Sequence, residues 1–114
     1  MVEMNCIFCK ITNGEIPTNF HYEGERVIAF ADLNPQAPTH LLLVPKSHYE
    51  NAAELAKGDP NALVEIFSAA EQLAREFNLE GYRTVFNTGA AAGQSVFHAH
   101  LHLLGGRAFS WPPG

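Results

Sequence analysis

Three of the six histidines alternate with apolar residues in the segment His98-Ala99-His100-Leu101-His102. Because successive side chains of a β-strand point to opposite faces of the sheet, this alternation predicts a strand, which we place at residues 96–104. The three imidazoles would line one face, and the intervening apolar residues, with Phe97 and Leu103, would line the other. Three adjacent imidazoles need three sets of hydrogen-bond partners, so their face is unsuited to an ordinary core. The pattern predicts a sheet with a core on one side and a histidine site on the other.

Two other interpretations of the histidine segment stay open at this point. It could be the solvated face of an edge strand, although Lys, Thr or Glu would fill such a face at lower cost. Alternating histidines also hold zinc or iron in several β-sheet enzymes, so the segment could be a catalytic metal site. The strand by itself does not separate these chemistries.

A loop of small residues immediately precedes the histidines, with the sequence Gly89-Ala90-Ala91-Ala92-Gly93-Gln94-Ser95. Small residues let main-chain N–H groups approach an anion closely, so this loop suits a phosphate group. Its position directly before the three histidines predicts histidine chemistry at a phosphorus centre.

The rest of the chain predicts an α+β fold. Runs of β-branched and aromatic residues predict strands at residues 20–22, 26–31, 40–44 and 82–87. A long helix is expected to begin with Asp59 as its N-cap and Pro60 as its first residue. Its apolar stripe, at steps of three and four, comprises Leu63, Ile66, Phe67, Ala70, Leu73, Ala74 and Phe77. Residues 6–13 predict a short N-terminal helix, and most joins are too short for parallel crossovers, which predicts an antiparallel sheet with one main helix.

Length and charge limit the functions open to this chain. Its 114 residues fit a single domain spanning residues 1–114. Seven basic and twelve acidic residues give a net charge of −5, which argues against a nucleic-acid partner. No stretch approaches the roughly 20 apolar residues of a membrane span, and the first residues do not resemble a secretory leader, so we expect a cytoplasmic protein without a membrane partner.

The two cysteines, Cys6 and Cys9, form a Cys-x-x-Cys pair. In a reducing compartment such a pair indicates a metal or redox site before a structural disulfide. Two thiolates at this spacing can bind one zinc ion, which needs two further ligands. The alternative is a pair of buried free thiols, while a redox role lacks the surrounding βαβ pattern.

The segment from His98 to Leu104 matches His-φ-His-φ-His-φ-φ, the pattern of the histidine triad (HIT) family, where φ is apolar. Other segments resemble the Hint branch of that family in the same order along nearly the whole chain. They are Cys6–Phe8, Gly14–Pro17, Asp32–His40, Val44–Lys46, Gly81–Arg83, Gly93–Phe97, Leu104–Arg107 and Trp111–Gly114. The resemblance implies a five-stranded antiparallel sheet and a homodimeric hydrolase of purine nucleoside 5′-phosphoramidates.

The resemblance also assigns catalytic roles. It implies that His100 is the nucleophile, which carries the nucleotide as a covalent intermediate until water releases AMP or GMP. His102 is expected to contact the phosphate and the leaving group, and His40 to orient the histidines. His98 completes the triad, and Ser95 with the N–H groups of its loop would hold the phosphate oxygens.

The same resemblance predicts a binding site for a purine nucleotide such as AMP or GMP. It places Asp32 at the ribose hydroxyls, where a carboxylate accepts two hydrogen bonds. An apolar slot for the base would comprise Ile7, Phe8, Phe30 and Leu33, although from the sequence alone each resembles core. The remaining expected contacts are Asn87, Gly93, Gln94, Ser95 and Val96, with Trp111 reaching the site of the partner subunit.

For the cysteine pair, the resemblance implies a structural zinc site with His48 and His98 as the other two ligands. No organic cofactor is expected. Three further hypotheses stay open: a nucleotide-binding regulatory protein, a dinucleoside polyphosphate hydrolase of the same family, and an enzyme with a catalytic metal on the histidines.

Overall fold

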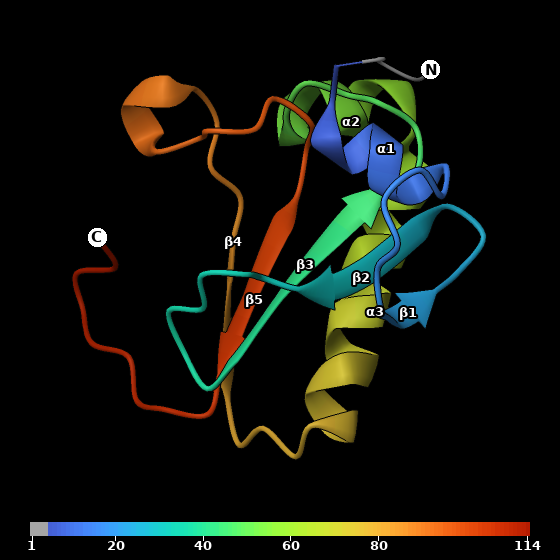
Figure 1. The fold of residues 1–114 in the computed structure, drawn as a ribbon. Coiled ribbons are helices and arrows are strands. Elements are labelled where there is room, and N and C mark those ends of the chain that lie inside the picture. Colours follow the sequence, from blue (N-terminus) through green and yellow to red (C-terminus); the bar gives the residue numbers. More distant parts are fainter. Residues whose placement is uncertain (1–4) are drawn as a thin grey trace.

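The computed structural model describes residues 5–114 and contains one five-stranded antiparallel sheet (Figure 1). Its strands lie in the order β1-β2-β3-β5-β4. They are β1 (Phe20–Glu23), β2 (Val27–Ala31), β3 (Thr39–Pro45), β4 (Tyr82–Val85) and β5 (Leu101–Gly105). The helices are α1 (Ile7–Thr12), α2 (Ala52–Gly58) and α3 (Pro60–Glu76), with a 3-10 turn at Ala90–Ala92. The predicted α+β fold with an antiparallel sheet is therefore confirmed.

Helix α3 covers one face of the sheet and forms the larger core. Asp59 caps it as predicted, because its carboxylate accepts the Ala62 N–H at 3.3 Å. The centre of the predicted stripe is buried, but Phe67 is 47% exposed, and Phe77, which follows the end of the helix, is 37% exposed. The buried set from the helix and the sheet includes Val27, Ala29, Leu41, Leu43, Ile66, Ala70, Leu73, Leu101 and Leu103.

Helix α1 covers the opposite face of the sheet, as Figure 1 shows. Phe8 and Ile11 of α1 pack there against Ile28, Phe30 and other side chains of β2 and β3 that point away from α3. The second core is smaller than the first. It leaves part of this face to the polar side chains described below.

The last strand is shorter than predicted, since β5 begins at Leu101 rather than at residue 96. His98 and His100 therefore precede the strand, and only His102 lies within it. The ladder with β3 runs no further than Leu43 opposite Leu101, and the ladder with β4 ends at Val85 opposite His102. Strand β3 continues to Pro45, but the segment before Leu101 does not pair with it, and the Ala99 N–H donates instead to the Tyr49 carbonyl at 2.7 Å.

The predicted separation of apolar and histidine side chains onto opposite faces of the sheet holds in part. Ala99, Leu101 and Leu103 belong to the core under α3 as expected, whereas Phe97 is 44% exposed. His100 and His102 lie on the α1 side, where their ring centres are 4.9 Å apart. Alternation thus continues through the unpaired segment as far back as His98, whose ring lies edge-on to Phe8 of α1.

Helix α2 was not predicted. Asn51 caps it by accepting the Glu54 N–H at 2.9 Å, and it buries Leu55 in the core under α3. The segment between β3 and α2 carries His48 past the start of the histidine segment. Among the described helices, none has the length and apolar character that crossing a membrane requires.

Candidate functional site

A cleft of about 560 Å³ opens on the α1 side of the sheet, with His100 and His102 in its lining. Seven of the residues expected from the sequence to bind substrate line it: Ile7, Phe8, Phe30, Asp32, Leu33, Ser95 and Val96. Four other expected contacts do not line it: Asn87, Gly93, Gln94 and Trp111. The cleft also takes in residues that the sequence reasoning did not assign, among them Ile16, Pro17, Asn19 and Leu42.

His100 is buried at the inner end of this cleft. Its Nδ1 lies 2.8 Å from the carbonyl oxygen of His98. A carbonyl only accepts, so Nδ1 carries the proton and Nε2 of the neutral ring keeps a lone pair. The ring of Phe8 packs edge-on against His100 with centres 5.0 Å apart, which fixes the plane of the imidazole. The structure therefore places an oriented, unprotonated nitrogen in an apolar pocket.

Sheet register brings His40 and His102 together. His40 of β3 lies opposite Leu104 of β5, and Leu42 lies opposite His102, so the two histidines are diagonal neighbours on one face. His40 Nε2 is 2.9 Å from His102 Nδ1. The carboxylate of Asp32, just after β2, lies 3.4 Å from His40 Nε2 and 3.9 Å from His102 Nδ1.

Hydrogen bonds assign the tautomers of both rings. The main-chain N–H of Gln36 donates to His40 Nδ1 at 3.0 Å, so a neutral His40 must carry its proton on Nε2. That proton points at His102 Nδ1, which therefore accepts. A neutral His102 then carries its own proton on Nε2. The result is a chain of donors from Gln36 through His40 to His102, ending in an N–H at the cleft.

Burial favours the neutral form of these histidines. Burial, together with the neighbouring rings of His100 and His40, lowers the pKa of His102 to about 4 against the attraction of Asp32. Burial also lowers the pKa of His40 and of His100 below the usual value, and Asp32 opposes both shifts. At neutral pH the cleft therefore presents uncharged imidazoles.

Part of the cleft lining is apolar. Phe8, which packs on His100, and Phe30 meet edge to face with ring centres 5.8 Å apart. Leu33 and Ile7 also line the cleft but are 100% and 47% exposed. The expectation from the sequence alone that these two side chains resemble core residues is thus wrong, since the structure leaves both at the surface.

The loop of small residues uses its N–H groups internally. The amides of Ala92 and Gln94 donate to the Gly89 carbonyl at 3.1 Å each, and the Gly93 amide donates to the Ala90 carbonyl at 3.0 Å. The buried side chain of Gln94 accepts the Gly89 N–H at 2.8 Å and donates to two further carbonyls. The loop therefore supports the segment that carries Ser95, and Ser95 itself lines the cleft.

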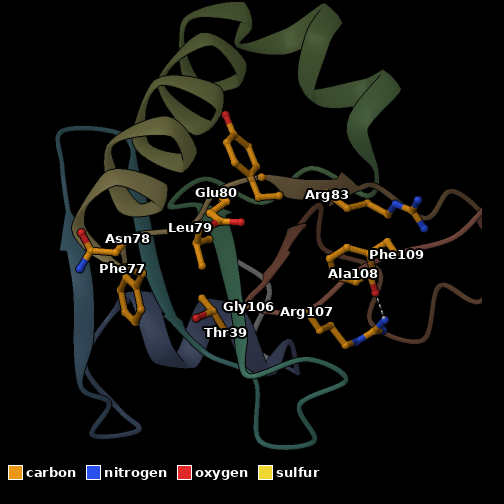
Figure 2. A pocket seen from close by; sticks show the side chains of 12 residues that line it. Thr39, Phe77, Asn78, Leu79, Glu80, Arg83, Gly106, Arg107, Ala108 and Phe109 are labelled. Carbon is orange, nitrogen blue, oxygen red and sulfur yellow. Dashed lines mark hydrogen bonds between the residues drawn. The ribbon is translucent and has the colours of Figure 1, made fainter.

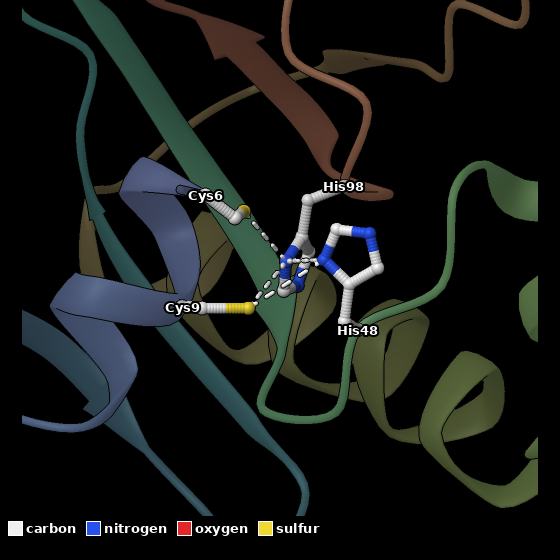
Figure 3. Close-up of side chains that lie close together, drawn as sticks. All are labelled: Cys6, Cys9, His48 and His98. Carbon is white, nitrogen blue, oxygen red and sulfur yellow. Dashed lines mark hydrogen bonds between the residues drawn. The ribbon is translucent and has the colours of Figure 1, made fainter. Parts of the chain in front are cut away.

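A second cluster lies behind His100, where α1, the segment after β3 and the segment before β5 meet (Figure 3). It comprises Cys6, Cys9, His48 and His98, whose ligand atoms all lie within 4.8 Å of one another. His98 Nδ1 is 3.3 Å from Cys6 Sγ, 3.5 Å from Cys9 Sγ and 3.2 Å from His48 Nδ1. The four residues proposed from the sequence are thus brought together.

This donor set fits a zinc ion. The His98 Nε2–H donates to the Pro45 carbonyl at 2.8 Å, which leaves a lone pair on Nδ1 facing both sulfurs. Burial lowers the pKa of His98 to about 4, so the ring is neutral. The two ring nitrogens and the two sulfurs converge within 4.8 Å of one another, which is an arrangement that a tetrahedral cation could bind at all four atoms.

Comparison with known proteins identifies the family. A family model described as "Scavenger mRNA decapping enzyme C-term binding" matches residues 5–110. An uncharacterized HIT-like protein of Synechococcus elongatus is 46% identical over 109 residues, which cover 95% of this chain and 96% of that protein. This chain belongs to the histidine triad (HIT) family.

Solved HIT structures show the same fold. The crystal structure of a HIT family hydrolase from Legionella pneumophila superposes with a TM-score of 0.91 at 48% identity, covering 96% of this chain and 100% of that one. Among HIT relatives, a protein of Zea mays named as a 14 kDa zinc-binding protein is 47% identical over 112 residues, 95% of this chain and 87% of its own length.

Proposed function

We propose that this HIT protein hydrolyses the P–N bond of purine nucleoside 5′-phosphoramidates, releasing AMP or GMP and an amine. One observation carries the proposal: the Nδ1–H of His100 is held by the His98 carbonyl, so Nε2 presents its lone pair in a cleft beside the His102 N–H. A neutral imidazole in this setting is a nucleophile at neutral pH.

In the proposed reaction the His100 Nε2 lone pair attacks phosphorus and forms a new P–N bond. The original P–N bond breaks, and the amine leaves with a proton taken from water in the cleft. The hydroxide left by that proton transfer then attacks the same phosphorus, the bond to Nε2 breaks, and neutral His100 is restored. Throughout, the Nε2–H of His102 and the hydroxyl of Ser95 are proposed to donate to the phosphate oxygens as charge develops on them.

The nucleoside is proposed to lie along the rest of the cleft. Asp32, in the loop after β2, would accept from the ribose hydroxyls, and its second oxygen is already held in place by the Asn34 N–H at 2.8 Å. The purine would lie between Phe8, Phe30 and the rim residue Leu33, which belong to the apolar lining of the cleft.

The Cys6, Cys9, His48 and His98 cluster is proposed to hold a structural zinc ion. Two thiolates and two imidazole nitrogens would complete its coordination. When bound, such an ion cross-links α1 to the segments on either side. Because His98 also provides the carbonyl that orients His100, the ion would stabilise the position of the nucleophile without contacting substrate.

We also infer a homodimer. Strand β4 lies at one edge of the sheet, so one side of its main chain lacks a strand neighbour. Phe67 of α3 and Phe86 after β4 pack together beside that edge, and Tyr82 is partly exposed on it. Trp111 is 81% exposed and does not line the cleft of its own chain, which supports the role of reaching the partner subunit's cleft.

The proposal is tested with purified protein and adenosine 5′-monophosphoramidate. We expect release of AMP and ammonia, and rapid acid quenching should trap an AMP adduct that peptide mass spectrometry maps to His100. Binding of AMP without turnover would favour a nucleotide-binding regulatory protein. Faster cleavage of a dinucleoside polyphosphate would favour the other hydrolase of this family, and a purely 12.5 kDa species in sedimentation would exclude the dimer.

A further inference from the structure

A second cleft, of about 790 Å³, lies beyond the other end of β5, and two of its arginines pack on one aromatic ring (Figure 2). The Cζ atoms of Arg83 and Arg107 lie 5.0 and 4.2 Å from the centre of the Phe109 ring. Their hydrogen bonds to the main chain differ. Arg83 Nη2 donates to the Ser110 carbonyl at 3.1 Å, within the C-terminal segment. Arg107 Nη1 donates within the same segment, to the Ala108 carbonyl at 3.0 Å, but its Nε donates to the Gln36 carbonyl at 3.1 Å.

Gln36 connects Arg107 to the histidines of the first cleft. It lies in the loop between β2 and β3, and its N–H donates to His40 Nδ1, whose Nε2–H donates to His102. Its side chain bonds only within the loop, to the Asn34 carbonyl at 3.0 Å. Of the interactions found for Gln36 in residues 5–114, the bond from Arg107 is thus the one that anchors it to the C-terminal segment.

A second contact ties the same two segments together. Gly106, next to Arg107, has a φ of +89°, and a Cβ there would lie 2.9 Å from Cβ of Pro38 at the end of the same loop. This is closer than two carbons can approach without movement, so glycine permits the close packing. The loop between β2 and β3 is therefore packed on residue 106 and hydrogen-bonded to residue 107.

We infer that Arg107 is a positioning residue that acts through Gln36 on the tautomer of His40. With the Gln36 N–H held at Nδ1, His40 keeps its proton on Nε2, and His102 must direct its own N–H into the cleft. If Gln36 turns away, the proton of His40 can move to Nδ1. His102 would then bear its proton on the side facing His40 and lose its donor to the phosphate. The kinetic consequence rests on the proposed function.

The test compares Arg107→Met with Arg83→Met. Methionine keeps an unbranched apolar stem that reaches the position of Nε beside Phe109 but removes the donors. Arg83 is the matched control, because it packs on the same ring and lines the same cleft but forms no bond to the loop. Two quantities are measured: the His40 tautomer, from the 15N shifts of the ring in long-range NMR correlation spectra, and kcat and KM for adenosine 5′-monophosphoramidate.

In the wild type and in Arg83→Met we expect His40 protonated on Nε2 alone. In Arg107→Met we expect an Nδ1–H population, a roughly three- to tenfold lower kcat and an unchanged KM. An unaltered His40 tautomer in Arg107→Met would overturn the inference. If Arg107→Met does not fold, Arg107→Lys, which keeps a donor but loses the fork, replaces it, with a smaller shift expected in the same direction. A wild type without turnover would refute the proposed function alone, since the NMR result still decides the role of Arg107.

Discussion

Two clusters of metal-ligand side chains lie on the same face of the sheet, and their hydrogen bonds set them apart. Cys6, Cys9, His48 and His98 form one, and Asp32, His40 and His102 form the other; in each, all ligand atoms lie within 4.8 Å of one another. By proximity alone both are candidate metal sites. The comparison therefore depends on which ring nitrogens are free to coordinate.

The tautomers of His98 and His40 differ in whether the nitrogen that faces the cluster is free to coordinate a metal. In the cysteine cluster, the Pro45 carbonyl takes the proton of His98 on Nε2 and leaves Nδ1 free toward the sulfurs. In the aspartate cluster, the Gln36 N–H occupies Nδ1 of His40, so Nε2, the atom near Asp32, carries a proton. A protonated ring nitrogen cannot coordinate a metal. One backbone hydrogen bond to each ring thus makes the difference: the bond to Pro45 leaves His98 able to bind a metal, and the bond from Gln36 makes His40 part of a hydrogen-bond relay.

The largest expected effect separates the proposed nucleophile, whose ring lies beside His102 of the aspartate cluster, from the cysteine cluster. His100→Ala should reduce turnover of adenosine 5′-monophosphoramidate on the order of 10³-fold or more, because the nucleophile is lost. The ring lies at a cleft, so its removal should shift Tm by only a few degrees. Cys9→Ala, with its buried sulfur in the cysteine cluster, is the contrasting variant and should retain measurable turnover at low temperature. Steady-state kinetics and thermal unfolding of both proteins check this, and equal turnover by His100→Ala and wild type would remove the nucleophile assignment.

Removal of the metal should have the next largest effect, and on stability. Extraction by a strong chelator is expected to cost roughly 3 kcal/mol or more, about 10 °C in Tm for a chain of this size. The readouts are metal content by mass spectrometry and Tm by calorimetry, and readdition of zinc should restore both. A control with Cys9→Ala, which lacks one ligand, should show little further loss on chelation. A Tm that chelation leaves unchanged, in protein shown to have contained zinc, would contradict the structural role.

Much of the sheet and helix arrangement follows from local patterns. Asp59 and Pro60 start α3 where capping rules place its beginning, and Ile66, Ala70 and Leu73 face the sheet because a helical period of 3.6 aligns them. The alternation around Leu101 likewise predicts which side chains lie under α3. These features depend on neighbours close in the chain, which a single sequence displays.

Features set by distant neighbours could not be predicted in this way. The strand begins at Leu101 although β3 continues to Pro45, because the Ala99 N–H bonds to the Tyr49 carbonyl outside the sheet, and no local pattern records this. The side chain of Gln94 braces its loop from within rather than lining the cleft, because Glu50 and Val96 offer it carbonyls. The bond from Arg107 to Gln36 joins residues 71 positions apart. Only packing in three dimensions reveals such roles.

The pH dependence of stability should be a smaller effect, from the aspartate cluster. His102 has a pKa of about 4 in the folded protein and near 6.5 when unfolded, because burial, His100 and His40 disfavour its charge more than Asp32 favours it. The unfolded chain then binds more protons below about pH 6.5, so stability falls as pH drops from there toward 4 and is constant above. We expect a loss of roughly 1–3 kcal/mol over this range from His102. Urea unfolding at a series of pH values gives the free energy of unfolding of wild type and His102→Gln. Between pH 6.5 and 4 this free energy should fall less steeply with pH in the variant, and an identical pH dependence would contradict the lowered pKa of His102.

The smallest expected effect is an absence of binding. With both cysteines replaced, as in Cys6→Ser with Cys9→Ser, the chain should retain no zinc at micromolar concentration, although Asp32, His40 and His102 still lie together. To coordinate zinc, His40 would have to give up the Nε2 proton, and Nδ1 could not take it while the Gln36 N–H points there. Isothermal titration of the double variant, with His40→Ala added as the control, checks this. Stoichiometric zinc binding that disappears with His40→Ala would show that the Gln36 bond yields to the metal, and the two clusters would then differ in affinity rather than in kind.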